Sequence, residues 1–253
     1  MQKIIICIIA GLGAGLGTGF AGMSAAAVIS PMLITFLDMD PYMAVGIALA
    51  SDVLASAASA VTYGRNKNID IRNGIIMMLC FTMVGSYVAS VVPKTTMGNF
   101  SVFMTLLLGI KFIVKPVTEP KKRFSGATAN QKAVRSVACG VAVGFICGFV
   151  GAGGGMMMLL ALTSILGYEL KTAVGTSVFI MSATALTGAV SHFAIGGMPD
   201  VTALIICIVS TLAFAQLAAV IANKAKSKTL NRVTGAILVV LGAAILGVNY
   251  FGG

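Results

Sequence analysis

The sequence predicts an all-α integral membrane protein made of two four-segment repeats, inverted relative to each other. Each repeat is expected to begin with a helix that glycines break or that re-enters the membrane. Composition is the first observation behind this prediction, because 58% of the residues are hydrophobic and only 9% are charged, against about 25% charged in soluble domains. The second observation is that long apolar segments fill most of the chain. The third observation is a glycine-rich stretch that occurs twice.

Charged residues divide the chain into eight apolar segments. They cover residues 4–37, 42–63, 74–92, 98–114, 136–168, 172–193, 201–222 and 233–251. The longest polar loop, residues 115–135, separates the first four segments from the last four. We therefore expect a first membrane repeat at residues 1–118, a cytoplasmic basic linker at 119–131 and a second membrane repeat at 132–253.

The two glycine-rich stretches lie in the longest segments. Gly11, Gly15, Gly19 and Gly22 recur 129 residues later as Gly140, Gly144, Gly148 and Gly151. A straight helix through either segment would measure roughly 50 Å, whereas the hydrocarbon core of a bilayer is about 30 Å thick. Each long segment is therefore predicted to be two half-helices. Glycines four residues apart also allow two helices to pack closely, and this reading stays open for Gly11, Gly15, Gly140 and Gly144.

The distribution of Lys and Arg favours re-entry over a full crossing. If all eight segments cross once, eleven of the 17 basic residues lie in cytoplasmic loops and six outside. If segments 4–37 and 136–168 leave on the side from which they entered, fifteen lie inside and only Lys3 and Lys94 outside. Cytoplasmic loops of membrane proteins are enriched in basic residues, so the second arrangement is preferred. It makes the two repeats inverted.

The breaks are the predicted binding site. A helix N-terminus presents free N–H groups and partial positive charge, which favours a bound anion. Small residues follow both breaks, where the second half-helices should begin, and let an anion approach the backbone. The candidate residues are Gly22, Ser24 and Ala25 in the first repeat and Gly151, Gly153, Gly154 and Gly155 in the second.

Two further segments carry polar candidates. Ser51, Ser177 and Thr184 lie on stripes of small and hydroxyl side chains at helical spacing, and they are predicted either to contact an oxyanion or to bond to backbone between helices. Asp52 is the one carboxylate well inside an apolar segment. Such a residue is a functional candidate because its charge is costly there. We interpret it as a proton-coupling residue, with a structural carboxyl as the alternative.

Several classes of function are disfavoured. The five cysteines lie in apolar segments without metal-ligand spacing, and no catalytic triad, paired carboxylates or nucleotide-binding loop in a suitable context is present. We expect neither an enzyme nor a cofactor or metal site. The net charge of +10 comes from basic residues in short loops, which indicates a cytoplasmic membrane face rather than a nucleic-acid partner.

The residues around the breaks resemble those of the TauE/SafE (sulfite exporter) family of membrane permeases. The resemblance rests on Gly19-Phe20-Ala21-Gly22, on Gly148-Phe149-Val150-Gly151 with the glycines after it, and on Ala-Val-Gly at residues 44 and 173. It implies a multi-pass transporter of the cell membrane for small sulfur-containing anions, such as sulfite, sulfoacetate or another sulfonate, working in export, and the interpretation of Asp52 adds coupling to protons. A carrier or channel for a carboxylate or a cation is the alternative. The expected partners are the small anion and the lipid bilayer, and a homodimer is allowed.

Overall fold

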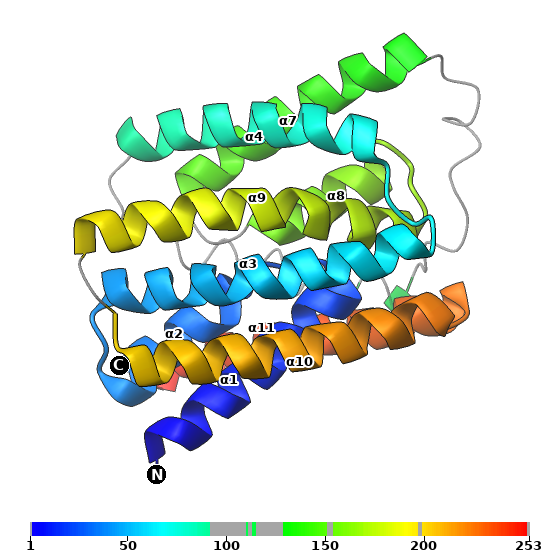
Figure 1. Cartoon of the computed structure of the whole chain (residues 1–253). Helices are drawn as coiled ribbons and strands as arrows, with labels where there is room; N and C mark the ends of the chain where they lie inside the picture. The colour runs from blue at the N-terminus through cyan, green and yellow to red at the C-terminus, as the bar shows by residue number, and fades with distance from the viewer. Residues whose placement is uncertain are drawn as a thin grey trace.

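The computed structural model describes residues 2–91, 110, 113–114, 129–150, 154–196 and 199–251. All the regular structure in these residues is helical. The helices are α1 (Gln2–Ala21), α2 (Ala26–Leu37), α3 (Pro41–Arg65), α4 (Ile71–Val91), α7 (Ala129–Val150), α8 (Gly154–Ser164), α9 (Leu170–Gly196), α10 (Val201–Lys224) and α11 (Ser227–Phe251). They run roughly along one common axis (Figure 1). Most of the expected segment at residues 98–114, and most of the basic linker, lie outside the described residues.

The helices have the composition of membrane spans. Four of those described are long and apolar enough to cross a bilayer: Gln2–Ala21, Tyr42–Arg65, Leu170–Ala194 and Val201–Lys224. Large aliphatic side chains such as Ile5, Ile9 and Ile205 are more than half exposed on the outside of the bundle, whereas hydroxyls and one carboxyl are buried inside it. Apolar surface outside and polar groups inside is the arrangement that a lipid environment requires.

Both long apolar segments are broken close to their glycines. In the first, α1 ends at Ala21, Gly22 takes a left-handed conformation with φ of 63°, and α2 begins at Ala26. Glycine adopts this conformation at no steric cost because it has no Cβ. In the second segment α7 ends at Val150 and α8 begins at Gly154.

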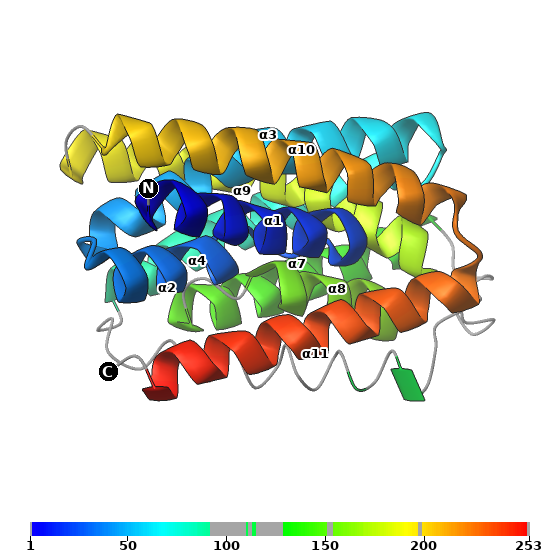
Figure 2. The ribbon, with the colours of Figure 1, turned by 90° about the horizontal axis from the view of Figure 1, so that it is seen from below.

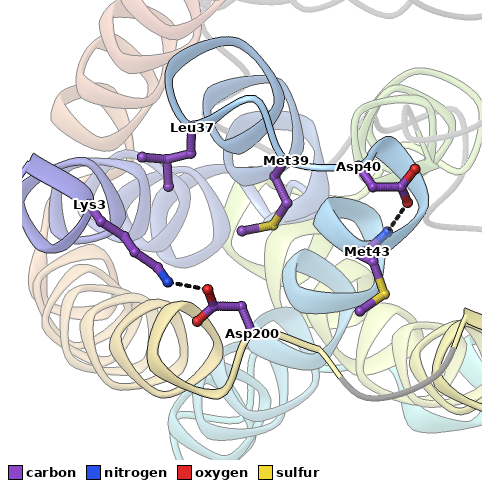
Figure 3. A pocket seen from close by; sticks show the side chains of 6 residues that line it. All are labelled: Lys3, Leu37, Met39, Asp40, Met43 and Asp200. Carbon is purple, nitrogen blue, oxygen red and sulfur yellow. Dashed lines mark hydrogen bonds and ion pairs between the residues drawn. The ribbon is translucent and has the colours of Figure 1, made fainter.

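The first broken segment returns to the end of the bundle from which it came. Lys3, at the start of α1, and Leu37, at the end of α2, line the same pocket (Figure 3). The second broken segment opens at the opposite end, because α7 begins where α3 ends and α4 begins (Figure 1). The chain after α8 closes back onto that end, where the Tyr168 hydroxyl donates to Asp70 at 2.6 Å. The two helix pairs therefore enter the bundle from opposite ends.

The two ends of the bundle differ in charge. We call the end that carries Asp38, Asp40 and Asp200, with Lys3, the acidic end. The other is the basic end, which carries Arg65, Lys67, Arg72, Lys171, Lys224, Lys226, Lys228 and Arg232. Its loops meet through the Asn68 amide, which donates to Asn223 at 2.7 Å, and through Lys171, which donates to the Asn223 carbonyl at 2.8 Å. Basic residues gathered at one end are typical of a cytoplasmic face.

The glycines before the first break are packing residues. A Cβ on Gly15 would lie 2.6 Å from the Thr211 carbonyl oxygen, and one on Gly19 would lie 2.5 Å from that of Ala215. A Cβ on Gly11 would meet the Ser210 side chain and would lie 3.1 Å from the Thr211 backbone nitrogen. These glycines are four residues apart, so they share one face of α1 and let its backbone touch that of α10. Close packing is thus the role of Gly11 and Gly15, and Gly140 packs likewise against Met77 and Cys80 of α4.

Candidate functional site

Side-chain hydroxyls from three other helices terminate α1. Tyr63 of α3 donates to the Gly19 carbonyl at 2.8 Å, Thr234 of α11 to the Phe20 carbonyl at 3.1 Å, and Ser177 of α9 to the Gly22 carbonyl at 2.8 Å. A helix leaves its last carbonyls without intrahelical partners, and in a membrane no water replaces them cheaply. The break is therefore held in place by the helices around it, and α1 and α2 lie between α10 and α11 (Figure 2).

The N-terminus of α2 faces a buried carboxyl. Ser24 accepts a hydrogen bond from the Ala26 N–H at 3.3 Å and donates its own hydroxyl to Asp52 Oδ2 at 2.6 Å. Ser56, one turn further along α3, donates to Asp52 Oδ1 at 2.6 Å, and the Ala25 backbone N–H also bonds to this carboxyl. Asp52 has no exposed surface. Its side chain, from the middle of α3, thus lies at the end of α2 that was predicted to attract an anion.

The start of α8 lies directly against the first break. A Cβ on Gly155, in the first turn of α8, would lie 2.7 Å from the Ser24 backbone nitrogen and 2.8 Å from the Gly22 carbonyl oxygen. A Cβ on Gly22 would lie 3.1 Å from the Ser177 Cβ. The start of α8 and the turn between α1 and α2 are therefore in backbone contact, and Ser177 of α9 packs against the same turn. Only glycine fits at position 155 without displacing one of them.

The structure brings together part of the predicted site. Gly22, Ser24, Ala25, Gly155, Ser177 and Asp52 gather around the first break. The hydroxyls of Ser51 and Thr184 instead donate within their own helices, Ser51 to the Ile47 carbonyl and Thr184 to those of Ile180 and Met181. Gly154 begins α8. Gly151 and Gly153 lie outside the described residues.

Sequence reasoning missed three residues that build this site: Ser56, Tyr63 and Thr234. Ser56 lies four residues after Asp52, on the same face of α3, so helical spacing could have identified it. Tyr63 and Thr234 reach the break from positions 44 and 214 residues distant in the chain. No local pattern carries that information.

A second polar cluster lies at the acidic end (Figure 3). Lys3 of α1 forms an ion pair with Asp200, which also caps α10 by accepting from the Ala203 N–H at 3.0 Å. The hydrogen bond from Lys3 lowers the pKa of Asp200 below its ordinary value. Together with Leu37, Met39, Asp40 and Met43, the pair lines a pocket of about 370 Å³. This pocket is an open depression between the ends of α1, α2, α3 and α10.

Comparison with known proteins identifies the family of this chain. The model of the family "Sulfite exporter TauE/SafE" matches residues 7–245, nearly the whole chain. The chain belongs to the TauE/SafE family. Two curated relatives come from Bacillus subtilis: the probable membrane transporter protein YunE is 26% identical over 97% of this chain and 98% of its own length, and the corresponding values for YdhB are 24%, 83% and 86%. The probable membrane transporter protein MJ0441 of Methanocaldococcus jannaschii is 24% identical over 74% of this chain and 71% of its own.

Membership of the TauE/SafE family sets the general activity. This chain is a multi-pass membrane transporter rather than an enzyme, and it works in a lipid bilayer on a small solute. The described helices that are long enough to cross a membrane agree with this. Among the described residues, irregular backbone meets buried polar groups at the first break, against the start of α8.

Proposed function

We propose that this protein carries small anions across the membrane, most of all sulfur-containing ones such as sulfite, sulfoacetate or another sulfonate, in a proton-coupled export cycle. One observation carries the proposal: the first turn of α8 touches the turn between α1 and α2, so that two half-helix starts meet inside the bundle. Broken helices that meet near the bilayer midplane form the binding sites of many secondary transporters. Helix N-termini at such a site favour a negatively charged solute.

The opposite directions of the two helix pairs support the inverted-repeat organisation of the two membrane repeats, residues 1–118 and 132–253. The α1–α2 pair opens at the acidic end and the α7–α8 pair at the basic end, as expected for one unit and its inverted copy. The site then lies between the repeats, and rocking one repeat against the other would expose it to each side in turn. The basic linker at 119–131 would join them on the cytoplasmic side.

Four donors from the starts of two helices are proposed to contact the anion. The hydroxyl of Ser24 and the backbone N–H of Ala25 lie at the start of α2. The first N–H groups of α8, from Gly154 and Gly155, lie on the opposite side of the contact. Ser177 supports the site indirectly, because its hydroxyl already donates to the Gly22 carbonyl. A sulfonate or sulfite, with three acceptor oxygens, suits several donors that converge from two helices.

Thermal stabilisation by a panel of small anions tests this function. The detergent-purified protein is melted with sulfite, ethanesulfonate, sulfoacetate, acetate and chloride at constant ionic strength. A ligand that binds only the folded state stabilises it by about 2.7 kcal/mol at one hundred times its Kd. We expect sulfite or a sulfonate to raise the melting temperature most. Ser24→Ala should reduce that shift, because it removes one donor to the anion.

Ser30→Ala is the matched control for this experiment. Ser30 lies six residues further along, in α2, is buried, and has a hydroxyl without a hydrogen-bond partner among the described residues. Its replacement should leave the anion-induced shift unchanged. If neither sulfite nor a sulfonate stabilises the wild type while a carboxylate does, the substrate class is wrong. If only cations stabilise it, the buried Asp52 makes a cation carrier the better function.

A further inference from the structure

The buried carboxyl of Asp52 is itself an anion at the start of α2. It lies in the middle of α3 with no exposed surface and is bonded to the Ser24 hydroxyl, the Ser56 hydroxyl and the Ala25 N–H. All three partners are neutral. A carboxylate can only accept hydrogen bonds, and three converging donors are the environment that an ionised carboxyl needs when it is removed from water. Asp52 therefore uses the donors that the transported anion would use.

No cation neutralises this carboxyl among the described residues. The helices that pack against α3 are α1, α2, α9 and α10. Their titratable side chains are Lys3 and Cys7 on α1, none on α2, Lys171 and His192 on α9, and Cys207 and Lys224 on α10. Lys3 pairs with Asp200, Lys171 bonds to the Asn223 carbonyl, and the His192 ring stacks on Tyr42 at 4.4 Å. These three contacts lie toward the two ends of the bundle, away from the middle of α3.

An anion that arrives at the start of α2 would meet a negative charge already there. Two unit charges of like sign repel strongly in a buried site, where water screens them little. Either the incoming anion stays away from α2, or the carboxyl loses its charge. A proton is the smallest cation that can remove the charge without displacing Ser24 or Ala25.

We propose that Asp52 is a tethered anion at the start of α2, and that its carboxyl binds one proton whenever the transported anion takes over the Ser24 and Ala25 donors. This inference rests on the proposed function. One O–H bond forms on Asp52 as hydronium from the solvent gives up its proton, and one O–H bond of the hydronium breaks to leave a water molecule. The hydrogen bonds from Ser24 and Ala25 pass to the incoming anion. With a monovalent substrate the site holds one negative charge before and after the exchange, so anion and proton move together.

Proton uptake during anion binding tests the proposal directly. Ethanesulfonate is the first probe, because its charge stays constant between pH 6 and pH 8. Sulfite is the second, with its own protonation subtracted. The purified protein in weak buffer should take up close to one proton per anion bound at the upper end of this range. Binding linked to one proton should then strengthen by about tenfold for each unit by which the pH falls.

Asp52→Asn separates the tethered anion from the remainder of the site. An amide keeps the size of the side chain but binds no proton, so the variant should bind ethanesulfonate with no proton uptake and with an affinity that does not change with pH. Asp40→Asn is the matched control on the same helix. Asp40 is an exposed cap at the start of α3, where its carboxylate accepts from the Tyr42 and Met43 N–H groups, and its variant should take up protons as the wild type does.

Ser24→Ala keeps the proposal testable if Asp52→Asn fails to fold. This variant retains the carboxyl and loses one donor to the anion, so affinity should fall while uptake stays near one proton per anion bound. Binding of either probe to the wild type without proton uptake, or equal uptake in Asp52→Asn and wild type, overturns the tethered-anion proposal and leaves the proposed function intact. Failure of both probes to bind at any pH overturns the two together.

Discussion

Three aspartates at helix N-termini mark the exposed and the buried regions of this molecule. Asp40 caps α3 and Asp200 caps α10, each from within its own chain segment and each partly open to water at the acidic end. Asp52 lies at the start of α2 but belongs to α3, and it is completely buried. The attraction between a carboxylate and the free N–H groups of a helix is the same in both regions. The consequence differs, because water screens the first two charges and not the third.

The comparison separates structural carboxylates from a functional candidate. A cap that is exposed stabilises a helix by about 1 kcal/mol and leaves the charge where solvent can accept it. A carboxylate that is removed from water is costly unless its environment compensates it. The start of α2 therefore requires both the donors around Asp52 and the packing of α8 and α9 that keeps it enclosed. Substitutions that disturb this packing should lower the stability more than substitutions at the caps.

A substitution at the contact between α8 and the first break should cause the largest loss of stability. Gly155→Ala places a methyl group 2.7 Å from the Ser24 nitrogen and 2.8 Å from the Gly22 carbonyl oxygen, both of which are backbone atoms that cannot rotate away. Such overpacking typically costs about 1–3 kcal/mol. Gly247→Ala is the control, because no atom of the part of the chain that the structure describes lies within 4 Å of a Cβ at that position of α11. The melting temperature should fall for the first variant and stay level or rise for the second, since alanine favours a helix over glycine.

Equal melting temperatures for Gly155→Ala and Gly247→Ala would contradict the backbone contact between α8 and the first break. That result would also remove the observation on which the proposed function depends. A loss of stability that sulfite or a sulfonate restores would sharpen the comparison, because it would show that the anion and α8 hold the same turn.

Removing a hydroxyl that terminates α1 should cause the next largest loss of stability. Ser177→Ala removes the donor to the Gly22 carbonyl oxygen. A buried carbonyl left without a partner costs about 1–3 kcal/mol. Ser182→Ala, one turn further along α9, is the matched control, because its hydroxyl donates to the Phe179 carbonyl within the same helix and its loss leaves the helical bond in place. Chemical unfolding in detergent should show a clear loss for the first variant and little for the second, and similar losses would contradict a break held from outside.

The same contrast decides what the sequence could predict. Composition and the long apolar segments were enough for the helical membrane class, and the glycine pairs located both breaks within a few residues. Asp40 followed by Pro41, a cap and a first-turn proline, marks the start of α3 in the local sequence. Asp52 was identifiable as a buried charge. Its position at the start of α2 was not, because it depends on how α3 packs against α2.

The hydroxyl candidates show the same limit. Ser51, Ser177 and Thr184 have similar sequence surroundings, small residues at helical spacing, yet of the three only Ser177 reaches beyond its own helix, to the Gly22 carbonyl in the turn between α1 and α2. Ser51 and Thr184 bond back to their own helices. A hydroxyl one turn after a carbonyl always has that local alternative. The choice between the two is made by the distance to the neighbouring helix, which no single sequence contains.

The ion pair at the acidic end gives the smallest expected effect. Lys3 and Asp200 have side chains that are 39% and 37% exposed, and exposed pairs contribute about 0–1 kcal/mol because solvent screens them. The pKa of Asp200 is lowered from its ordinary value, chiefly by the hydrogen bond from Lys3. The stabilisation is therefore present at neutral pH and is lost as the pH falls below about 4 and the carboxylate takes up a proton.

Lys3→Met should melt slightly below the wild type at pH 7, and the two melting temperatures should converge in acid. High salt at pH 7 should shrink the difference as well. A difference in melting temperature that persisted at low pH and high salt would mean that Lys3 acts through packing of its aliphatic stem. The Lys3–Asp200 pair would then no longer be an example of a screened charge to set against the unscreened charge of Asp52.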